Sequence, residues 1–586
     1  MDKILILDFG SQTTQLIGRR IRDLGVYTEI VPGDSPLSGI LNPADKADKG
    51  ADVIRGIILS GSPESVYENG PAPDKAVYHC GLPLLGICYG LQRLNYDNGG
   101  AVEALPEREY GRIGVKMRNA EEEARREDLR GRSATEGSGG SHERLTREFL
   151  AAFDPAFSLD ALIGRSASGA PPPSAPPVAA SAAFTAWMSH GDTLTRLAPG
   201  LREYGTSHTG YPAVVIHDAK PWFGLQFHPE VTHCERGLEI LAAFVFGVCG
   251  CSAGWTMEQY VEEARRVLKK RVGDNPVLLL ISGGVDSTVA GALLLKTLDP
   301  QAVHLMYMDT GLMRKDETKT VQANLERLGA RRLHIIHCEE EFLAALKGLD
   351  EPEAKRRAIG DLFIAIQERE VARLGLPDSY VLAQGTLYTD LVESGKGVGK
   401  KAHLIKSHHN VGSPLVDAKR QAGRIIEPLD RLYKDEVRRL GRILGVDEAV
   451  ILRHPFPGPG LAVRILGEVT REKCEILREA DAIFIEELKK RPAPGATGLT
   501  LYDEIWQAFA VLLPIRSVGV AGDVRKYGWV LALRAITSAD GMTADVYPFP
   551  VKDLLEISTR ITNTVTDIGR VTYDISSKPP ATIEWE

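Results

Sequence analysis

The chain has 586 residues, of which 43% are hydrophobic and 25% are charged, as in an ordinary globular protein with room for about three or four domains. Its 70 Lys and Arg against 78 Asp and Glu give a net charge of −8, so it has no basic excess for wrapping a nucleic acid. The seven cysteines are scattered, which excludes a disulfide framework, and no apolar run is long enough for a membrane span. We therefore expect a soluble protein of the reducing cytoplasm, with neither nucleic-acid nor membrane partners.

The first 117 residues alternate between apolar strands and helix-compatible segments. Apolar runs at 3–9, 56–63 and 83–90 each meet a glycine and then a segment that can form a helix. This alternation predicts a doubly wound parallel sheet of the α/β class, whose functional residues lie at the carboxyl ends of the strands.

Residues 118–183 interrupt this pattern. They contain a charge run at 120–132, a linker-like stretch at 136–141 and a Pro/Ala-rich stretch at 169–183. Such composition buries too little apolar surface to offset the entropy of ordering. We expect a mobile surface insertion, with a small extra subdomain as the alternative, inside a first domain that spans 1–250.

Cys88 is the first candidate catalytic residue. It lies in Gly-Ile-Cys-Tyr-Gly at 86–90, between a predicted strand and a predicted helix. Glycines on both sides allow the sharp turn that lifts a nucleophile out of a sheet, and the helix N-terminus would favour a thiolate. Taken alone, the string also fits a buried structural cysteine.

Two further segments could complete a site around this cysteine. His228 and Glu230 are two residues apart in Phe-His-Pro-Glu, so on a strand they point the same way, and Glu230 could hold the tautomer of a basic His228. The turn Ser-Gly-Ser-Pro-Glu-Ser at 60–65 could aim backbone N–H groups at a developing oxyanion. Singly, a core histidine and a plain turn remain open alternatives.

In this order, the three segments resemble the class I glutamine amidotransferase family. The resemblance implies that Cys88 attacks the side-chain amide of glutamine, with His228 and Glu230 as its partners, and that the backbone N–H groups of Ser62 and Tyr89 form the oxyanion hole. The family usually has Gly-Gly where this chain has Gly61-Ser62. If the turn needs a positive φ, Ser62 is strained there, and we then expect glutaminase activity to depend on activation by the second domain.

A second strand-helix alternation starts after Trp255, and we assign residues 251–465 to a second doubly wound domain. Its strand at 275–281 runs into a loop whose glycines, hydroxyl groups and helix N-terminus suit a phosphate group, and no Gly-Lys-Ser/Thr of a Walker A loop is present. The loop resembles the pyrophosphate loop of the ATP pyrophosphatase family, which implies ATP as a substrate and Asp286 as a Mg²⁺ ligand. The predicted ATP-binding residues are Ser282, Gly283, Gly284, Val285, Asp286, Ser287 and Thr288.

Other strings in this domain carry candidate polar groups. The segment 383–394 places Asp390 and Glu393 three residues apart, and 405–410 holds Lys406, His408 and His409 in a predicted loop. We expect this loop to close over the phosphates as a lid. Each string also fits a charged surface turn. The remaining residues, 466–586, mix short strands with helices and predict a small α+β domain.

The strings together resemble glutamine-hydrolysing GMP synthases, a family that joins the two activities. The resemblance covers nearly the whole chain except 118–183, and it implies that adenylylated XMP is aminated to GMP with Mg²⁺ and ATP. It also implies a homodimer formed through the C-terminal domain. By correspondence, the XMP-binding residues are Arg356, Asp523, Lys578, Ile583 and Glu584.

Two rival interpretations differ in class. A glutamine-dependent NAD synthetase also joins a glutaminase to an ATP pyrophosphatase, but its usual Glu-Lys-Cys glutaminase motif is absent here. A non-enzymatic regulator could retain the fold. The joint retention of Cys88, His228, Glu230 and the phosphate loop argues against it.

Overall fold

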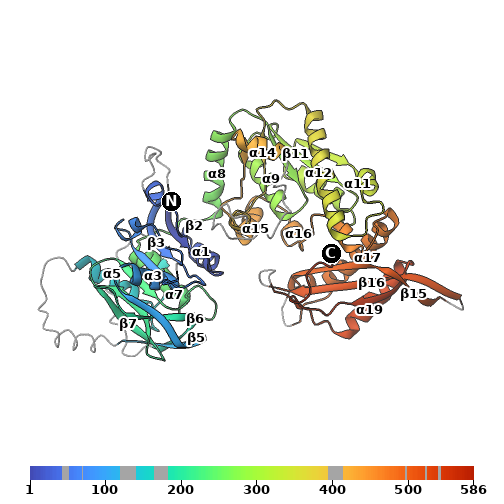
Figure 1. Cartoon of the computed structure of the whole chain (residues 1–586). Helices are drawn as coiled ribbons and strands as arrows, with labels where there is room; N and C mark the ends of the chain where they lie inside the picture. Colours follow the sequence, from blue (N-terminus) through green and yellow to red (C-terminus); the bar gives the residue numbers. More distant parts are fainter. Residues whose placement is uncertain are drawn as a thin grey trace, which may run out of the picture. The chain divides into compact units, whose positions relative to one another are not determined.

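The computed structural model describes residues 1–41, 52–68, 70–118, 140–160, 162–163, 183–393, 414–494, 498–521, 524–538 and 543–586. The chain forms two compact units (Figure 1). Unit 1 comprises Met1–Tyr260 and Thr389–Ile405, and unit 2 comprises Val261–Tyr388 and Lys406–Glu586. Across the described residues, no helix combines the length and apolar character needed to cross a membrane. All seven cysteines are free thiols, and six of them are buried.

Unit 1 is built on a nine-stranded sheet whose first five strands, in the order β2-β1-β3-β4-β9, are parallel. The apolar runs of β1, β3 and β4 at 4–7, 57–59 and 84–87 are buried, as expected for a sheet covered on both faces. Strand order reverses between β1 and β3, which is the switch point where α/β proteins place their sites. These strands are β1 (Asp2–Asp8), β2 (Tyr27–Pro32), β3 (Val53–Leu59), β4 (Leu84–Ile87) and β9 (Trp222–Leu225).

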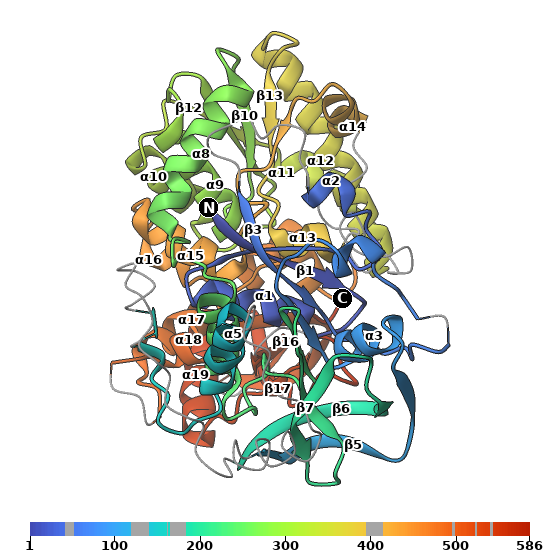
Figure 2. The same ribbon diagram turned by 90° about the vertical axis from the view of Figure 1, so that its left-hand side faces the viewer.

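The other half of this sheet is antiparallel. It adds β8 (Pro212–His217), β7 (Leu201–Ser207), β5 (Ala101–Met117) and β6 (Ala183–Arg196), in that order. Figure 2 shows β5, β6 and β7 gathered away from β1 and β3. The predicted parallel sheet is therefore confirmed for the first half only, because the long strands β5 and β6 pair directly with each other and need no crossover helix.

The helical elements of unit 1 follow the loops at the strand ends. They are α1 (Thr14–Asp23), α2 (Ser38–Leu41), the 3₁₀ turn η1 (Lys75–Tyr78), α3 (Tyr89–Asp97), α5 (Gly140–Ala151), α7 (Gly237–Ala242) and the π-helical η2 (Ala243–Val248), while α8 (Met257–Val272) leads into unit 2. Helix α3 packs against β4, so its N-terminus lies at the carboxyl end of that strand.

Helix α5 lies inside the segment predicted as a mobile insertion, and this prediction is wrong for residues 140–160. Phe149 and Phe153 are buried, and their rings lie 4.7 Å from Phe223 and 5.6 Å from Phe184 respectively. The guanidinium of Arg236 donates to the carbonyl oxygen of Ala152 at 2.9 Å. Two aromatic anchors thus order a helix whose flanking composition is linker-like. Residues 119–139 and 164–182 lie outside the described part of the chain.

Unit 2 contains a five-stranded sheet that is parallel throughout, in the order β12-β11-β10-β13-β14. This confirms the second doubly wound sheet. Its order reverses between β10 and β13, so the loop after β10 lies at the switch point. The strands are β10 (Val277–Ile281), β11 (Val303–Asp309), β12 (Arg332–His337), β13 (Val381–Ala383) and β14 (Ile425–Ile426).

The helices of unit 2 that flank this sheet include the one that starts at the phosphate loop, α9. They are α9 (Val285–Thr297), α10 (Glu317–Arg327), α11 (Glu339–Leu346), α12 (Pro352–Leu374), α14 (Pro414–Gln421), α15 (Lys434–Ile443), α16 (Glu448–Ile451) and the 3₁₀ turn η3 (Gly460–Arg464). Helix α13 (Tyr388–Glu393) begins in unit 2, and its residues from Thr389 onward belong to unit 1.

The C-terminal part of unit 2 is the predicted α+β fold. Strands β15 (Gln507–Ala521) and β16 (Val524–Thr537) form a long antiparallel hairpin that extends beyond the helices in Figure 1. One hydrophobic core joins this part to the parallel sheet, from Leu278 of β10 to Leu531 of β16. The remaining elements are α17 (Arg471–Lys490), α18 (Leu501–Glu504), β17 (Asp545–Val546), α19 (Val551–Thr564) and β18 (Ile568–Tyr573).

Candidate active sites

Cys88 forms a strained elbow between β4 and α3. Its backbone has φ 53° and ψ −109°, and among the described non-glycine residues only Asp316 shares a positive φ. A Cβ on Gly90 would lie 2.1 Å from the carbonyl oxygen of Leu59, and a Cβ on Gly86 would lie 2.6 Å from the backbone nitrogen of Leu91. Both glycines are therefore required by close backbone approach, as a nucleophile elbow demands.

His228 and Glu230 are buried beside this elbow. Nδ1 of His228 donates to Oε1 of Glu230 at 2.7 Å, which orients the imidazole. Burial lowers the pKa of His228, but the negative charges of Glu230 and of a Cys88 thiolate outweigh it, and the net pKa is raised above its ordinary value. The predicted residues Cys88, His228 and Glu230 thus lie together.

Strand β6 frames the same three residues. The backbone N–H of His228 donates to the carbonyl oxygen of Trp187 at 2.9 Å, and Sγ of Cys88 lies 3.9 Å from the carbonyl oxygen of Ser189. Nε2 of Gln226 lies 3.9 Å from the same sulfur. Sequence reasoning did not find these contacts, because strand pairing brings them from distant positions.

The turn after β3 lies against the imidazole. A Cβ on Gly61 would lie 3.3 Å from Cε1 of His228. Within the part of the chain that the structure describes, the backbone N–H groups of Ser62 and Tyr89 make no hydrogen bond. The strain expected at Ser62 is absent, because its φ is not positive. Serine is therefore accommodated in this turn without the left-handed backbone that would favour glycine.

The loop after β10 brings the seven predicted ATP-binding residues together. Gly283 has a φ of +78°, and Gly284 precedes the first turn of α9. The hydroxyl of Ser287 lies 3.0 Å from that of Ser282, and the hydroxyl of Thr288 donates to the carbonyl oxygen of Gly284 at 2.8 Å. The N-terminus of α9 points its free N–H groups into this loop, as in an anion site.

Two cations that the sequence analysis missed reach this loop from α15 and from the 453–464 segment. Nζ of Lys434 lies 2.6 and 2.5 Å from the two carboxylate oxygens of Asp286, with the side chains 46% and 31% exposed. Arg453 donates to the carbonyl oxygen of Gly283 at 2.9 Å and forms an ion pair with Glu317. These contacts join residues more than a hundred positions apart, and the spacing of residues along the chain does not predict such contacts.

Three family models match the chain. The glutamine amidotransferase class-I model matches residues 5–151 and 178–248, the NAD synthase model matches 256–360, and the GMP synthase C-terminal domain model matches 496–585. The first model covers both halves of the nine-stranded sheet, the second covers β10 to β12 of the parallel sheet of unit 2, and the third covers most of the C-terminal α+β part.

Full-length relatives decide the family. Glutamine-hydrolysing GMP synthases of Alkalilimnicola ehrlichii, Aquifex aeolicus and Chromobacterium violaceum are 44%, 43% and 42% identical to this chain. Each similarity spans 100% of this chain and 98%, 99% and 100% of the relative, respectively. The chain belongs to the glutamine-hydrolysing GMP synthase family. This excludes the NAD synthetase alternative, and the ATP pyrophosphatase-type domain of the family implies ATP as a substrate.

The C-terminal tail of this GMP synthase family member is held by two arginines, the buried Arg464 and the half-buried Arg356. Arg464 donates to both carboxylate oxygens of Glu584 at 3.0 and 2.8 Å, and Gln507 donates to the same carboxylate at 2.8 Å. Arg356 donates to the carbonyl oxygen of Glu586 at 2.5 Å. The structure thus brings Arg356 to the end of the tail, while the carboxylate of Glu584 is already paired.

The other predicted nucleotide residues are distributed differently. The backbone of Lys578 pairs with Ala544, and the carbonyl oxygen of Ile583 accepts from Arg534 at 2.8 Å. Asp390 and Glu393 lie in α13. The remaining predicted residues, Asp523, Lys406, His408 and His409, lie outside the described residues.

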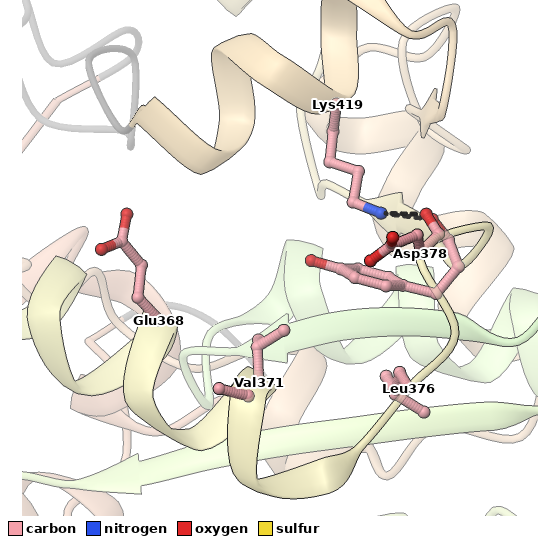
Figure 3. Close-up of a pocket in the computed structure, with 7 residues that line it drawn as sticks. Glu368, Val371, Leu376, Asp378 and Lys419 are labelled. Atoms are coloured by element: carbon pink, nitrogen blue, oxygen red, sulfur yellow. Dashed lines mark hydrogen bonds between the residues drawn. The ribbon is translucent and has the colours of Figure 1, made fainter.

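A separate cavity of about 310 Å³ opens between α12, α14 and the start of β13 (Figure 3). Nζ of Lys419 lies 3.3 Å from the centroid of the Tyr380 ring and donates to the carbonyl oxygen of Asp378 at 2.9 Å. Glu368 and Val371 line the opposite wall. No predicted site residue lines this cavity, so it adds nothing to the assignment of either site.

Proposed function

We propose that this chain makes GMP in two coupled half-reactions at the two sites described above. At the first site, glutamine and water give glutamate and ammonia. At the second, ATP adenylylates the C2 oxygen of XMP with release of pyrophosphate, and ammonia displaces AMP to give GMP. Adenylylation is needed because the C2 oxygen of XMP, which is amide-like, is a poor leaving group, whereas AMP is a good leaving group.

In the first half-reaction, Cys88 is the nucleophile. His228 takes the thiol proton and returns it to the leaving ammonia, and a thioester with the glutamyl group remains. Water, activated by His228, then hydrolyses the thioester to glutamate and the free thiol. Glu230 holds the imidazole through the 2.7 Å bond to Nδ1, and its charge stabilises the imidazolium.

The backbone N–H groups of Ser62 and Tyr89 are the proposed oxyanion donors. Their lack of any hydrogen bond within the described chain supports this role, because a preorganised donor must be free to meet charge that develops in the transition state. This assignment also predicts that the turn is ready for catalysis before the second site is occupied.

In the second half-reaction, the loop from Ser282 to Thr288 binds the phosphates of ATP through backbone N–H groups and hydroxyls. Asp286 would hold Mg²⁺ together with phosphate oxygens, since an exposed carboxylate beside a phosphate loop is the donor set that Mg²⁺ prefers. When bound, Mg²⁺ neutralises charge on the pyrophosphate that leaves. Lys434 and Arg453 add positive charge at the same loop.

XMP is proposed to bind beside the C-terminal tail. Arg356 and Lys578 suit its phosphate, and Asp523 and Glu584 suit hydroxyl or base N–H groups. Since Glu584 is paired with Arg464, it can accept from XMP only by sharing or exchanging that partner. Ile583 would contact the base. Asp390, Glu393, Lys406, His408 and His409 remain the proposed lid over the phosphates.

The domain limits follow the same proposal. We assign 1–250 to the glutaminase, 251–465 to the ATP pyrophosphatase and 466–586 to dimerisation and XMP binding. A homodimer through the last domain is supported by the β15–β16 hairpin, where Ile515, Val518 and Val520 are 56%, 50% and 79% exposed. A cytoplasmic location follows from the supply of ATP and XMP there.

One assay tests the whole proposal. The purified chain is incubated with XMP, MgATP and either glutamine or an ammonium salt, and GMP, AMP, pyrophosphate and glutamate are measured. We expect GMP from both nitrogen sources, with glutamate only from glutamine. A chain that releases glutamate but forms no GMP from either source would contradict the synthetase half.

A further inference from the structure

One short segment of β6 contacts both Cys88 and His228 of the proposed glutaminase site. Its Trp187 carbonyl oxygen accepts the backbone N–H of His228, and its Ser189 carbonyl oxygen lies next to Sγ of Cys88. The carbonyl oxygen of Asp192 accepts from Gln92 of α3 at 2.9 Å. Any shift of this segment therefore reaches both the nucleophile and the base.

The same segment also ties down the turn that carries the proposed oxyanion donor. The carboxylate of Asp192 accepts the hydroxyl of Tyr67 at 2.9 Å and also that of Ser65. Both residues follow Ser62 within five positions. The segment Trp187–Asp192 thus connects the nucleophile helix, the base and the oxyanion turn.

A buried pair of side chains also joins this segment of β6 to β5. Nε2 of His190 lies 3.0 Å from Oε2 of Glu109, and the two side chains are 2% and 3% exposed. Within the described chain, neither of these two atoms has a hydrogen-bond partner elsewhere. The 3.0 Å contact is thus the one polar interaction described for either atom, and removing one side chain leaves the other atom buried and unpaired.

The remaining polar atoms of the pair are also used. Nδ1 of His190 donates to the carbonyl oxygen of Asp192 at 2.9 Å, so both imidazole nitrogens face acceptors. Oε1 of Glu109 accepts the hydroxyl of Thr209. Glu109 and His190 are also direct partners in the β5–β6 ladder, at the edge of a register shift between Ala104 and Glu109 where the regular pairing is interrupted.

We propose that Glu109 and His190 are positioning residues for the glutaminase reaction, which fix β6 so that Cys88, His228 and the oxyanion turn keep their productive geometry. This rests on the proposed glutaminase function. The pair touches no reacting atom, and it acts through the backbone of residues 187–192. It adds a specific side-chain contact at the position where the ladder resumes after the register shift.

The test compares two replacements of one carboxylate. Glu109→Gln keeps an acceptor of nearly the same size, whereas Glu109→Leu keeps the volume and removes the acceptor. Since a misplacement of about 1 Å costs about 100-fold in rate, we expect Glu109→Leu to lower kcat for glutamate release by about 10- to 100-fold. Glu109→Gln should lose no more than about fivefold. Ammonia-dependent GMP formation should be unchanged in both.

The split between kinetic constants separates positioning from a merely structural role. Glu109→Leu should change KM for glutamine much less than kcat, at a temperature where circular dichroism shows the variant folded. As a matched control, Glu203→Leu removes the ion pair between Glu203 and Arg118 in the same antiparallel half. It should leave kcat within about twofold of the unmodified chain, since that pair is partly exposed.

A second variant keeps the proposal falsifiable if Glu109→Leu does not fold. In His190→Asn, the amide can still donate to Asp192 but cannot reach Glu109, so it should show the same fall in kcat. Unaltered kcat in both Glu109→Leu and His190→Asn would overturn the positioning role. Absence of glutamate release from the unmodified chain would instead overturn the glutaminase function itself.

Discussion

The proposed glutaminase and synthetase sites differ in how far their polar groups are paired inside the protein. At the first site, His228 and Glu230 are buried and fixed by a 2.7 Å hydrogen bond, and Cys88 has a strained backbone. At the second, the carboxylate of Asp286 is 31% exposed and meets a Lys434 side chain that is 46% exposed. One site is assembled by folding, and the other presents charges to solvent.

The difference follows from what each site must bind. A thiolate nucleophile gains from a dry, fixed environment, because charge that develops there is stabilised by preorganised groups. A phosphate loop must admit a highly charged nucleotide and its counter-ion, so its own charges stay accessible and exchangeable. The groups of the first site are therefore held in place by folding, whereas we expect the charged groups of the second to rearrange when the ligand binds.

Cys88→Ala should separate the two sites most sharply. It should lower glutamine-dependent GMP formation by at least about 1,000-fold and spare the ammonia-dependent reaction, because the thiolate is needed only to free ammonia. GMP formation with each nitrogen source is the measurement. Near-normal use of glutamine by this variant would show that the nucleophile lies elsewhere.

Asp286→Asn should affect both nitrogen sources equally. Adenylylation precedes amination, so we expect pyrophosphate release from ATP and XMP to fall by about 100-fold. Lys434→Met serves as the companion variant, since it removes the partner of Asp286 but leaves the carboxylate. Pyrophosphate release at the normal rate in Asp286→Asn would remove this carboxylate from the mechanism.

Glu230→Gln and Asp286→Asn should differ in their effect on stability. The first change disturbs a fully buried hydrogen bond and should lower the free energy of unfolding of unit 1 by about 1–3 kcal/mol. The second removes an exposed ion pair and should cost less than about 1 kcal/mol. Urea unfolding of both variants is the measurement. Equal losses in the free energy of unfolding would contradict the view that folding fixes the first site more firmly than the second.

His454 provides the smallest test, because it fixes the segment that carries Arg453. Its Nε2 donates to the carbonyl oxygen of Tyr502 at 2.8 Å, and its Nδ1 accepts the backbone N–H of Ala508. Burial lowers the pKa of His454 from 6.5 to about 4, and the nearby positive charges of Arg314 and Lys489 add to the shift.

Since the unfolded chain binds this proton more tightly, stability from neutral His454 is complete above pH 6.5 and is lost as the pH falls toward 4. We expect unit 2 to lose roughly 1–2 kcal/mol between pH 7.5 and 5 from this group. His454→Gln, which keeps a donor and an acceptor, should weaken the dependence. An identical pH profile in the variant would contradict this assignment.

Much of both sites could be predicted because their chemistry lies in short strings at strand ends. The string Gly-Ile-Cys-Tyr-Gly predicts the sharp turn at Cys88 by itself. Its two glycines leave the space that the nearby backbone of Leu59 and Leu91 requires. The phosphate loop is equally local: its hydroxyls bond within the stretch from Ser282 to Thr288. Local strings of this kind need little information from the rest of the chain.

The contributions that could not be predicted come from long-range pairing. Lys434 is 148 residues from Asp286, and Ser189 is 101 residues from Cys88. Helix α5 was missed for a related reason. Its order comes from Phe149 and Phe153, which meet rings of β9 and β6, whereas the surrounding composition argues for disorder. The composition of a whole segment does not show that two aromatic residues within it are placed to pack against the core.

The burial of the cysteines has a consequence for chemical labelling. Burial raises the pKa of Cys234, Cys251 and Cys338 to about 12 and that of Cys474 to about 11, and it raises the pKa of Cys249 as well. Since mild electrophiles react with thiolates, we expect these five thiols to react slowly with them. A chloroacetamide probe read by peptide mass spectrometry would therefore leave these five positions largely unlabelled, so that labelling of Cys88, the proposed nucleophile, could be followed against a low background.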